Sequence, residues 1–142
     1  MKAQELWNKY TTDETLSYEA WAFGGDPDGL AALVCEGIKT ATSSGYIFYE
    51  LENETIPQVG EYSVILNSSE EAVCVIQTIK VEVVPFNQVS ENHAYKEGER
   101  NRTLQDWKDI HEEFFKHECE LAGIEFSEKM LVVCEEFKVV YQ

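Results

Sequence analysis

The chain has 142 residues, of which 44% are apolar and 12% aromatic, and it carries a formal net charge of −16. This length fits one domain that buries roughly two thirds of the surface its unfolded chain would expose, and the composition excludes an intrinsically disordered protein. Tight binding to long RNA or DNA relies on basic side chains that neutralise phosphates, so a chain with 11 Lys and Arg against 27 Asp and Glu is not expected to bind long nucleic acids tightly.

The N-terminal segment predicts short helices and no targeting signal. Residues 3–10 and 14–22 place apolar side chains at helical spacing. We interpret residues 1–24 as a helical extension of a single domain that spans residues 1–142. No apolar run approaches the length of a signal-peptide core or a membrane span. We therefore expect a cytoplasmic protein without a membrane partner, and its oligomeric state stays open.

The next helix has clear boundaries, and three strands follow it. Asp26 is a suitable N-cap, Pro27 occupies the first helical position, and Gly37 follows the last turn. Alternating apolar residues then predict strands at 46–51, 61–66 and 72–84, with a hairpin turn at 67–70 between the last two.

The C-terminal half predicts one long helix and a final strand. A short helix or turn at residues 87–95 and a charged loop at 96–102 precede the N-cap Thr103 of the long helix, which ends before Gly123. Residues 130–141 form a strand that is apolar on both faces in its first half, which is typical of an inner strand. Because repeated βαβ units are absent, we expect an α+β fold whose mixed or antiparallel sheet curls toward a barrel, with helices packed outside.

The strongest candidate for a functional site is the polar loop that covers residues 39–44. It places a lysine among four hydroxyl side chains, and a hydroxyl becomes a nucleophile when a desolvated amine takes its proton. The alternative is a solvated loop whose hydroxyls satisfy backbone groups. In a straight strand Lys39 and Thr42 would point to opposite faces, so their cooperation is expected to require a turn between them.

A second polar cluster lies just before the long helix. Glu97 and Glu99 flank a glycine there, and a partly buried carboxyl group beside the lysine would be able to act as a general acid or base. The alternative is a charged, solvated loop. Nothing in the residue pattern decides whether the two clusters meet.

The cysteines and histidines do not form a metal-binding pattern. The four cysteines are widely spaced without a C-x-x-C pair, so we expect buried thiols rather than structural zinc or disulfides. His111 and His117 lie on different faces of the predicted long helix, and His93 stands apart from both. We interpret His111 as a partly buried, hydrogen-bonded member of the apolar stripe, and we expect neither a metal nor a cofactor.

Several segments together resemble the ASCH domain family in its bacterial stand-alone form. They are residues 33–44 with the run G-I-K-T-A-T, residues 57–62, Pro85-Phe86, residues 93–104 with the run E-G-E, Trp107, His111, and residues 133–141. The resemblance covers nearly the whole chain from Ala20 onward. It implies a PUA-like β-barrel with flanking helices and a cleft whose floor includes the lysine loop, and the family is linked to RNA binding and transcription coactivation.

One bacterial subgroup of this family hydrolyses the acetyl amide of N4-acetylcytidine with a lysine, a threonine three residues later and a downstream glutamate. By resemblance, Lys39 would accept the proton of Thr42, Thr42 would attack the acetyl carbonyl, and Glu97 would protonate the departing amine and later activate water. The resemblance also implies that His93-Ala94 anchors Glu97. The substrate-binding residues implied are Thr40, Ser43, Ser44, Glu99 and Arg100. Ser44 stands where this subgroup has an arginine, and Arg100 begins the pair that replaces a common Gly-Asp.

Three functions stay open on these grounds. The first is an amidohydrolase that acts on an acylated nucleoside. The second is a module that binds a small nucleoside, a nucleotide or short single-stranded RNA without turnover, and the third is a metal-independent ribonuclease. The acidic balance favours small ligands over polymers, whereas the missing arginine favours binding over catalysis.

Overall fold

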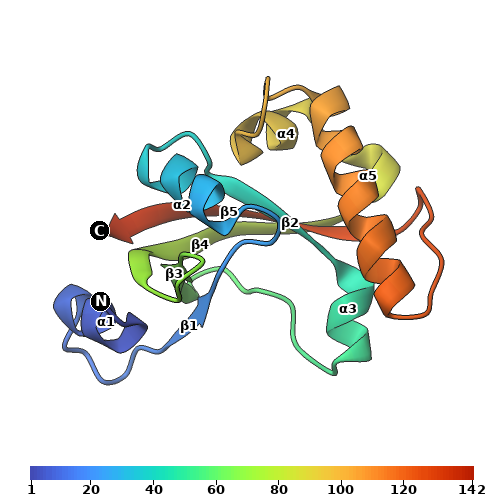
Figure 1. Cartoon of the computed structure of the whole chain (residues 1–142). Coiled ribbons are helices and arrows are strands. Elements are labelled where there is room, and N and C mark those ends of the chain that lie inside the picture. Colours follow the sequence, from blue (N-terminus) through green and yellow to red (C-terminus); the bar gives the residue numbers. More distant parts are fainter.

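The computed structural model describes the whole chain, residues 1–142, as an α+β fold built around one sheet (Figure 1). Its elements in chain order are α1 (Ala3–Tyr10), β1 (Tyr18–Trp21), α2 (Pro27–Cys35), β2 (Ala41–Gly45), α3 (Tyr46–Leu51), β3 (Tyr62–Leu66), β4 (Ala72–Pro85), the 3₁₀ turn η1 (Phe86–Gln88), α4 (Glu91–Glu97), α5 (Leu104–Leu121) and β5 (Leu131–Tyr141). In Figure 1, α1 lies at one end of the molecule and α5 at the other. None of the helices combines the length and the apolar character needed to cross a membrane.

The sheet is mixed, as expected, but the expectation of a barrel is wrong because the sheet stays open. The strand order is β1-β3-β4-β5-β2, with β1 and β3 parallel and all other neighbours antiparallel. Closure would require the edge strands β1 and β2 to pair along a common length, and they have only four and five residues. The chain just before β2 is bonded instead to α4, through Thr40 N and Lys96 O at 2.7 Å.

Most of the predicted elements are confirmed, because local signals set their boundaries. Asp26 Oδ1 accepts a hydrogen bond from Gly29 N at the start of α2 (3.0 Å), and Thr103 Oγ1 accepts one from Asp106 N at the start of α5 (3.1 Å). The hairpin between β3 and β4 is also present. β5 lies between β4 and β2, as its two apolar faces predicted.

The helix expected at residues 14–22 is wrong, since this segment contains β1. The apolar residues that suggested one helical face serve two separate parts of the core. Leu16 packs against the cluster that includes Trp7, whereas Phe23 belongs to the cluster that includes Val34. An extended chain that pairs with β3 lets both side chains reach their clusters.

The predictions for residues 41–51 are also wrong. Part of the segment predicted as a loop forms a strand, and the segment predicted as a strand forms a helix. Residues 41–45 form β2, and residues 46–51 form α3. The reason lies in the partner strand: Gly45 pairs with Val132, near the first residue of β5. Beyond Gly45 the chain has almost no partner strand left, so a helix satisfies its backbone groups instead.

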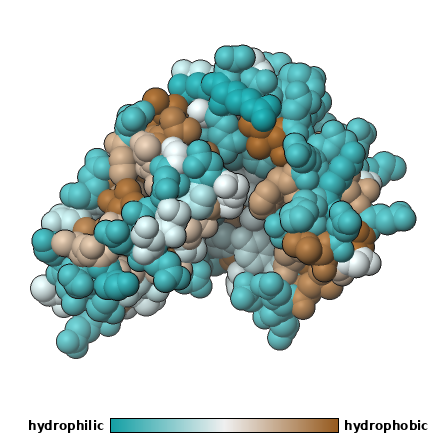
Figure 2. Space-filling view, viewed as in Figure 1, coloured by the Kyte–Doolittle hydropathy of each residue, from teal (hydrophilic) through white to brown (hydrophobic).

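The buried apolar side chains form three clusters, and the polar residues described below lie between two of them. One cluster packs α2 against the sheet around Phe23 and Val34, and a second packs α5 against the sheet around Phe86, Trp107 and Phe115. The third lies under α1. On the face drawn in Figure 2, the surface is hollowed between the half that carries α1 and α2 and the half that carries α3 and α5.

Candidate functional site

Lys39 is positioned by the turn that ends α2. Gly37 has a φ of 79°, a left-handed conformation that glycine adopts at low cost. The backbone N–H groups of Ile38 and Lys39 both donate to Leu33 O (3.0 and 3.1 Å). Because β2 begins only at Ala41, Lys39 lies outside the strand and its side chain is not bound by strand alternation. Contrary to our expectation, no turn between Lys39 and Thr42 is needed for both to face one space.

The segment after α2 crosses the end of α4 at Gly98. Gly98 has a φ of 74°, and a Cβ atom there would lie 2.9 Å from Ile38 O. Both observations require glycine, because other residues avoid this φ and the contact with a backbone oxygen cannot relax by a rotamer change. The crossing brings Lys39 next to Glu97, although 58 positions separate them in the chain.

Arg102 stabilises the crossing of α4 and the segment after α2 by hydrogen bonds to both. Its Nε donates to Tyr95 O (2.9 Å) in α4 and its Nη2 donates to Ile38 O (3.3 Å) in the segment after α2. The guanidinium carbon also lies 3.6 Å from the centroid of the Tyr95 ring, an arrangement in which a cation is attracted to the ring face. One side chain therefore ties together the two segments that supply the candidate site.

Glu97 is the centre of a buried polar network. It is 1% exposed, and its carboxylate contacts the side chains of Lys39, Ser43, His93, Trp107 and His111. Oε1 lies 3.4 Å from Lys39 Nζ and 3.3 Å from His111 Nε2. Oε2 accepts hydrogen bonds from Ser43 Oγ and Trp107 Nε1 and lies 2.9 Å from His93 Nε2. Both oxygens of this buried carboxylate are thus compensated, which its burial requires.

α5 supplies two of these partners from consecutive turns. Trp107 and His111 are four positions apart and therefore share one face of the helix. Their rings stack with centroids 4.4 Å apart and an interplanar angle of 15°. His111 Nδ1 donates to Trp107 O (2.9 Å), which leaves Nε2 to face Glu97.

The pKa values of the acids follow from these contacts. Burial raises the pKa of Glu97, but the charges of His111 and Lys39 and the hydrogen bonds from His111 and His93 outweigh it and hold this pKa well below 4.5. Burial also raises the pKa of Glu99, and here the attraction of Lys39, 3.9 Å away, does not outweigh it. Glu97 is therefore fixed as a carboxylate, whereas Glu99 takes up a proton more readily.

The pKa of His111 is raised, whereas burial alone would lower the pKa of a histidine. Burial lowers its pKa, but the charge of Glu97 and the hydrogen bonds to Glu97 and to Trp107 O raise it above 6.5 overall. The imidazolium form is stabilised because the ionised carboxylate of Glu97 faces it.

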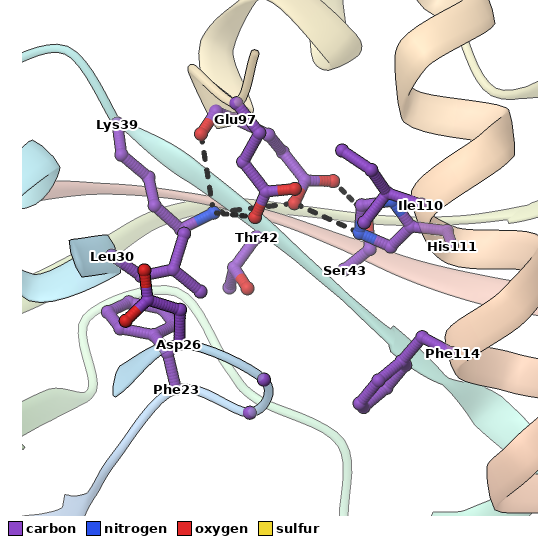
Figure 3. A pocket seen from close by; sticks show the side chains of 13 residues that line it. Phe23, Asp26, Leu30, Lys39, Thr42, Ser43, Glu97, Ile110, His111 and Phe114 are labelled. Carbon is purple, nitrogen blue, oxygen red and sulfur yellow. Dashed lines mark hydrogen bonds and ion pairs between the residues drawn. The ribbon is translucent and has the colours of Figure 1, made fainter. Parts of the chain in front are cut away.

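These groups surround a cavity of about 230 Å³ (Figure 3). Lys39 and Glu97 meet at one side of it, and Thr42 and Ser43 approach from β2. Apolar side chains complete the lining, among them Phe23, whose ring centroid lies 5.2 Å from Lys39 Nζ. The Ser43 hydroxyl donates a hydrogen bond to Glu97. The Thr42 side chain lines the cavity and makes no hydrogen bond within the protein.

The cavity brings together five of the eight residues expected from the sequence. They are Lys39, Thr42, Ser43, Glu97 and Glu99. Thr40 lies elsewhere, with its Oγ1 donating to Lys96 O (3.5 Å). Ser44 Oγ lies 2.9 Å from Tyr49 Oη and lines the neighbouring cavity. Arg100 is exposed and is not part of the lining.

Two partners of Glu97 did not follow from the sequence, and a third followed only from the family resemblance. The resemblance implied that His93 and Ala94 anchor Glu97, and His93 Nε2 lies 2.9 Å from Glu97 Oε2. The spacing of four positions joins side chains on a helix, but the helix predicted there ended at Tyr95. His111 is buried and hydrogen-bonded as predicted, yet its contact with Glu97 was not foreseen, nor was the bond from Trp107. No three His, Cys, Asp or Glu side chains converge in a way that would hold a metal ion.

A family model and a solved structure identify the same family. The sequence model of the ASCH domain matches residues 19–141, and no curated protein matches the chain. The crystal structure of an ASCH domain from Lactobacillus crispatus is 36% identical, with a TM-score of 0.92 over 98% of this chain and 94% of that one. A protein from Enterococcus faecalis is 35% identical, with a TM-score of 0.88 over 97% and 87% of the two chains. A hypothetical protein of 13% identity, with a TM-score of 0.60 over 87% of this chain and 99% of that one, shares the fold alone.

Proposed function

The chain belongs to the ASCH domain family, and on that premise we propose that it is an amidohydrolase that removes the acyl group from a nucleoside such as N4-acetylcytidine. The observation that carries this proposal is the single cavity shared by Lys39, Thr42, Glu97 and Glu99. An amine, a free hydroxyl and two carboxyl groups of different proton affinity are able to supply the nucleophile and the proton transfers of acyl transfer to water.

Thr42 is the proposed nucleophile. Its hydroxyl faces the cavity and has no hydrogen-bond partner in the protein, whereas the hydroxyl of the neighbouring Ser43 donates a hydrogen bond to Glu97. A hydroxyl without a protein partner is free to approach an acyl carbon atom. The Lys39 side chain reaches into the same space (Figure 3), so its amine is the proposed acceptor of the Thr42 proton.

Glu99 is proposed to exchange protons with the leaving amine, in place of Glu97. The resemblance to the hydrolase subgroup assigned this role to Glu97, whose pKa is held well below 4.5 after burial is outweighed by His111 and Lys39. Burial raises the pKa of Glu99 instead, and a general acid works best when its pKa approaches the working pH. In this proposal Glu97 holds and orients Lys39.

The first half of the proposed reaction transfers the acyl group to Thr42. In the resting site Lys39 is an ammonium ion paired with both carboxylates, and it passes one proton to Glu99. The neutral amine then takes the Thr42 proton while the Thr42 oxygen bonds to the acyl carbon. The C–N bond breaks, the departing amine takes the proton from Glu99, and an ester remains on Thr42.

The second half returns the site to its starting state. Water attacks the ester and gives a proton to Glu99. The C–O bond to Thr42 breaks, and the Thr42 oxygen recovers a proton from Lys39, which then receives the proton held by Glu99. The sum is amide plus water giving amine and carboxylic acid, with all three side chains restored.

A module that binds a nucleoside without turnover is the alternative favoured by one observation. Ser44, at the position of the subgroup's arginine, is bonded to Tyr49, and no arginine lines the cavity. A ribonuclease that acts on long RNA is less compatible with the net charge of −16.

The proposal is tested by incubating the purified protein with N4-acetylcytidine and measuring the cytidine released by liquid chromatography. Lys39→Met and Thr42→Ala are each expected to lower kcat/KM by at least about 100-fold, because the proton acceptor or the nucleophile is lost. Thr40→Ala is the matched control: this hydroxyl lies outside the cavity, and activity should stay within about threefold of wild type. Release by the wild type that does not exceed release by Lys39→Met would leave only the binding module.

A further inference from the structure

A second and larger cavity adjoins the one around Lys39. Its volume is about 610 Å³, which is in the usual range for pockets that hold small organic ligands. The two cavities share Phe23, Gly24, Thr42 and Ser43 in their linings. A ligand whose reacting group lies at Thr42 therefore extends directly into the second cavity.

The two linings differ in charge. In the first cavity the basic side chains of Lys39 and His111 stand among the carboxyl groups of Asp26, Glu97 and Glu99. No Lys, Arg or His lines the second, which instead presents the carboxyl groups of Glu19, Glu54, Glu61 and Glu135. Such a lining repels phosphate groups and attracts N–H and O–H donors. Trp21 and Tyr49 add aromatic rings to it, and aromatic rings are surfaces on which nucleobases stack.

Glu135 is the part of this lining that points most directly to a ligand. It is 7% exposed, and its Oε2 accepts a hydrogen bond from Thr78 Oγ1 (2.6 Å). No side chain or backbone group donates to Oε1, and because no fully buried side-chain oxygen or nitrogen lacks a partner, Oε1 is accessible from the cavity that Glu135 lines. Glu135 also pairs with Thr42 across β5 and β2, so the two side chains stand next to each other on one face of the sheet. An acceptor that is open to the cavity and has no donor within the protein thus lies beside the proposed nucleophile.

We infer that the second cavity holds the part of the substrate that does not react, and that this part is an unphosphorylated nucleoside rich in N–H and O–H donors. The inference rests on the proposed function, because it takes Thr42 as the point where the acyl group lies. It goes further by excluding phosphorylated substrates: the four carboxyl groups of the second cavity repel the phosphate groups of nucleotides and RNA. Glu135 and Glu61 are the residues that set this specificity.

The test is a binding measurement, which needs no turnover. Isothermal titration of the intact protein with cytidine and with cytidine 5′-monophosphate, at about 0.15 M salt to limit long-range effects, compares two ligands that differ only by the phosphate. We expect cytidine to bind at least about tenfold more tightly than the monophosphate. Glu61→Gln and Glu135→Gln should each weaken cytidine binding by about threefold or more and narrow the difference between the two ligands. Glu113→Gln, which changes an exposed glutamate of α5, is the matched control and should bind both ligands as wild type does.

The outcomes separate this inference from the proposed function. Equal or tighter binding of the monophosphate, no binding of cytidine, or unchanged binding by both cavity variants overturns the inference, even if N4-acetylcytidine is hydrolysed. Preferential binding of cytidine that is lost in the two variants supports the inference, even if no hydrolysis occurs and the proposed function fails.

Discussion

Glu97 and Glu135 are both buried carboxyl groups, 1% and 7% exposed, but their surroundings differ in kind. Glu97 has five side-chain partners, two of which, Lys39 and His111, bring positive charge. Glu135 has a single donor, Thr78, and acidic neighbours. Burial raises the pKa of both; at Glu97 the cations reverse the effect, whereas at Glu135 the charges of Glu61 and Glu19 add to it.

This difference shows that partners, rather than burial, decide the charge of a carboxyl group in the core. Around Glu97 every donor and acceptor is matched, so the region is suited to hold Lys39 in a fixed position. Around Glu135 acceptors outnumber donors, so the region is suited to receive donors from a ligand. Changes that remove one partner at a time sharpen this comparison.

The largest effect is expected from removing the charge of Glu97. In Glu97→Gln the buried cations of Lys39 and His111 lose their common partner, and losing one member of a buried ion pair costs about 3 to 5 kcal/mol. The free energy of unfolding from urea titrations measures this loss. Glu99→Gln is the control, because Glu99 is partly exposed (17%) and its removal should cost less than about 1 kcal/mol. Equal losses in both variants would contradict the central role of Glu97.

The next effect comes from the indole that donates to Glu97. Trp107→Phe removes this hydrogen bond, and a bond to a charged group is worth about 1.5 to 3 kcal/mol. Trp7→Phe is the matched control, since Trp7 is similarly buried, at 6% against 3%, and makes no side-chain hydrogen bond. We expect Trp107→Phe to lower the unfolding free energy by about 1.5 kcal/mol or more beyond the loss in Trp7→Phe. Similar losses of unfolding free energy in the two variants would mean that the hydrogen bond from Trp107 to Glu97 adds little to stability.

A smaller effect is expected from the titration of His111, which makes the free energy of unfolding depend on pH. Its folded pKa is raised above 6.5 because the charge of Glu97 and its hydrogen bonds outweigh burial, so the stabilisation is fully present below about 6.5 and is lost as the pH rises through the folded pKa. Urea unfolding at about pH 5.5 and about pH 8.5 measures it. His111→Gln should cost more stability at the lower pH than at the higher one. A cost that is the same at both values would show that the imidazolium form is not favoured.

The smallest effect is expected at Glu135, and in the opposite direction. Its folded pKa is raised, so its contribution to stability is present below about 4.5 and is lost as the pH rises through the folded pKa. Glu135→Gln removes an uncompensated acid while its amide oxygen still accepts from Thr78. At neutral pH the variant should be as stable as wild type or more stable by up to about 1 kcal/mol, as measured by urea unfolding. A clear loss of stability would show that the carboxylate is already satisfied within the protein.

The sequence alone determined the features that depend on neighbouring residues. The caps at Asp26 and Thr103 set the starts of α2 and α5, and alternation with a short hairpin set β3 and β4. These signals are local hydrogen bonds and periodicities, so they can be followed without knowing what packs where. The lysine loop and the E-G-E run were also found this way, because unusual polar runs next to helix ends stand out in a sequence.

Only the tertiary structure decided what these polar runs do. The meeting of Lys39 with Glu97 depends on a crossing at Gly98, on the clamp by Arg102 and on two residues of α5, none of which is near Lys39 in the chain. The open sheet and the strand β2 depend likewise on which strands find partners. The pKa is lowered for Glu97 but raised for Glu99 and Glu135. These shifts depend on burial and on distances between residues that lie far apart in the chain, which a linear sequence does not contain.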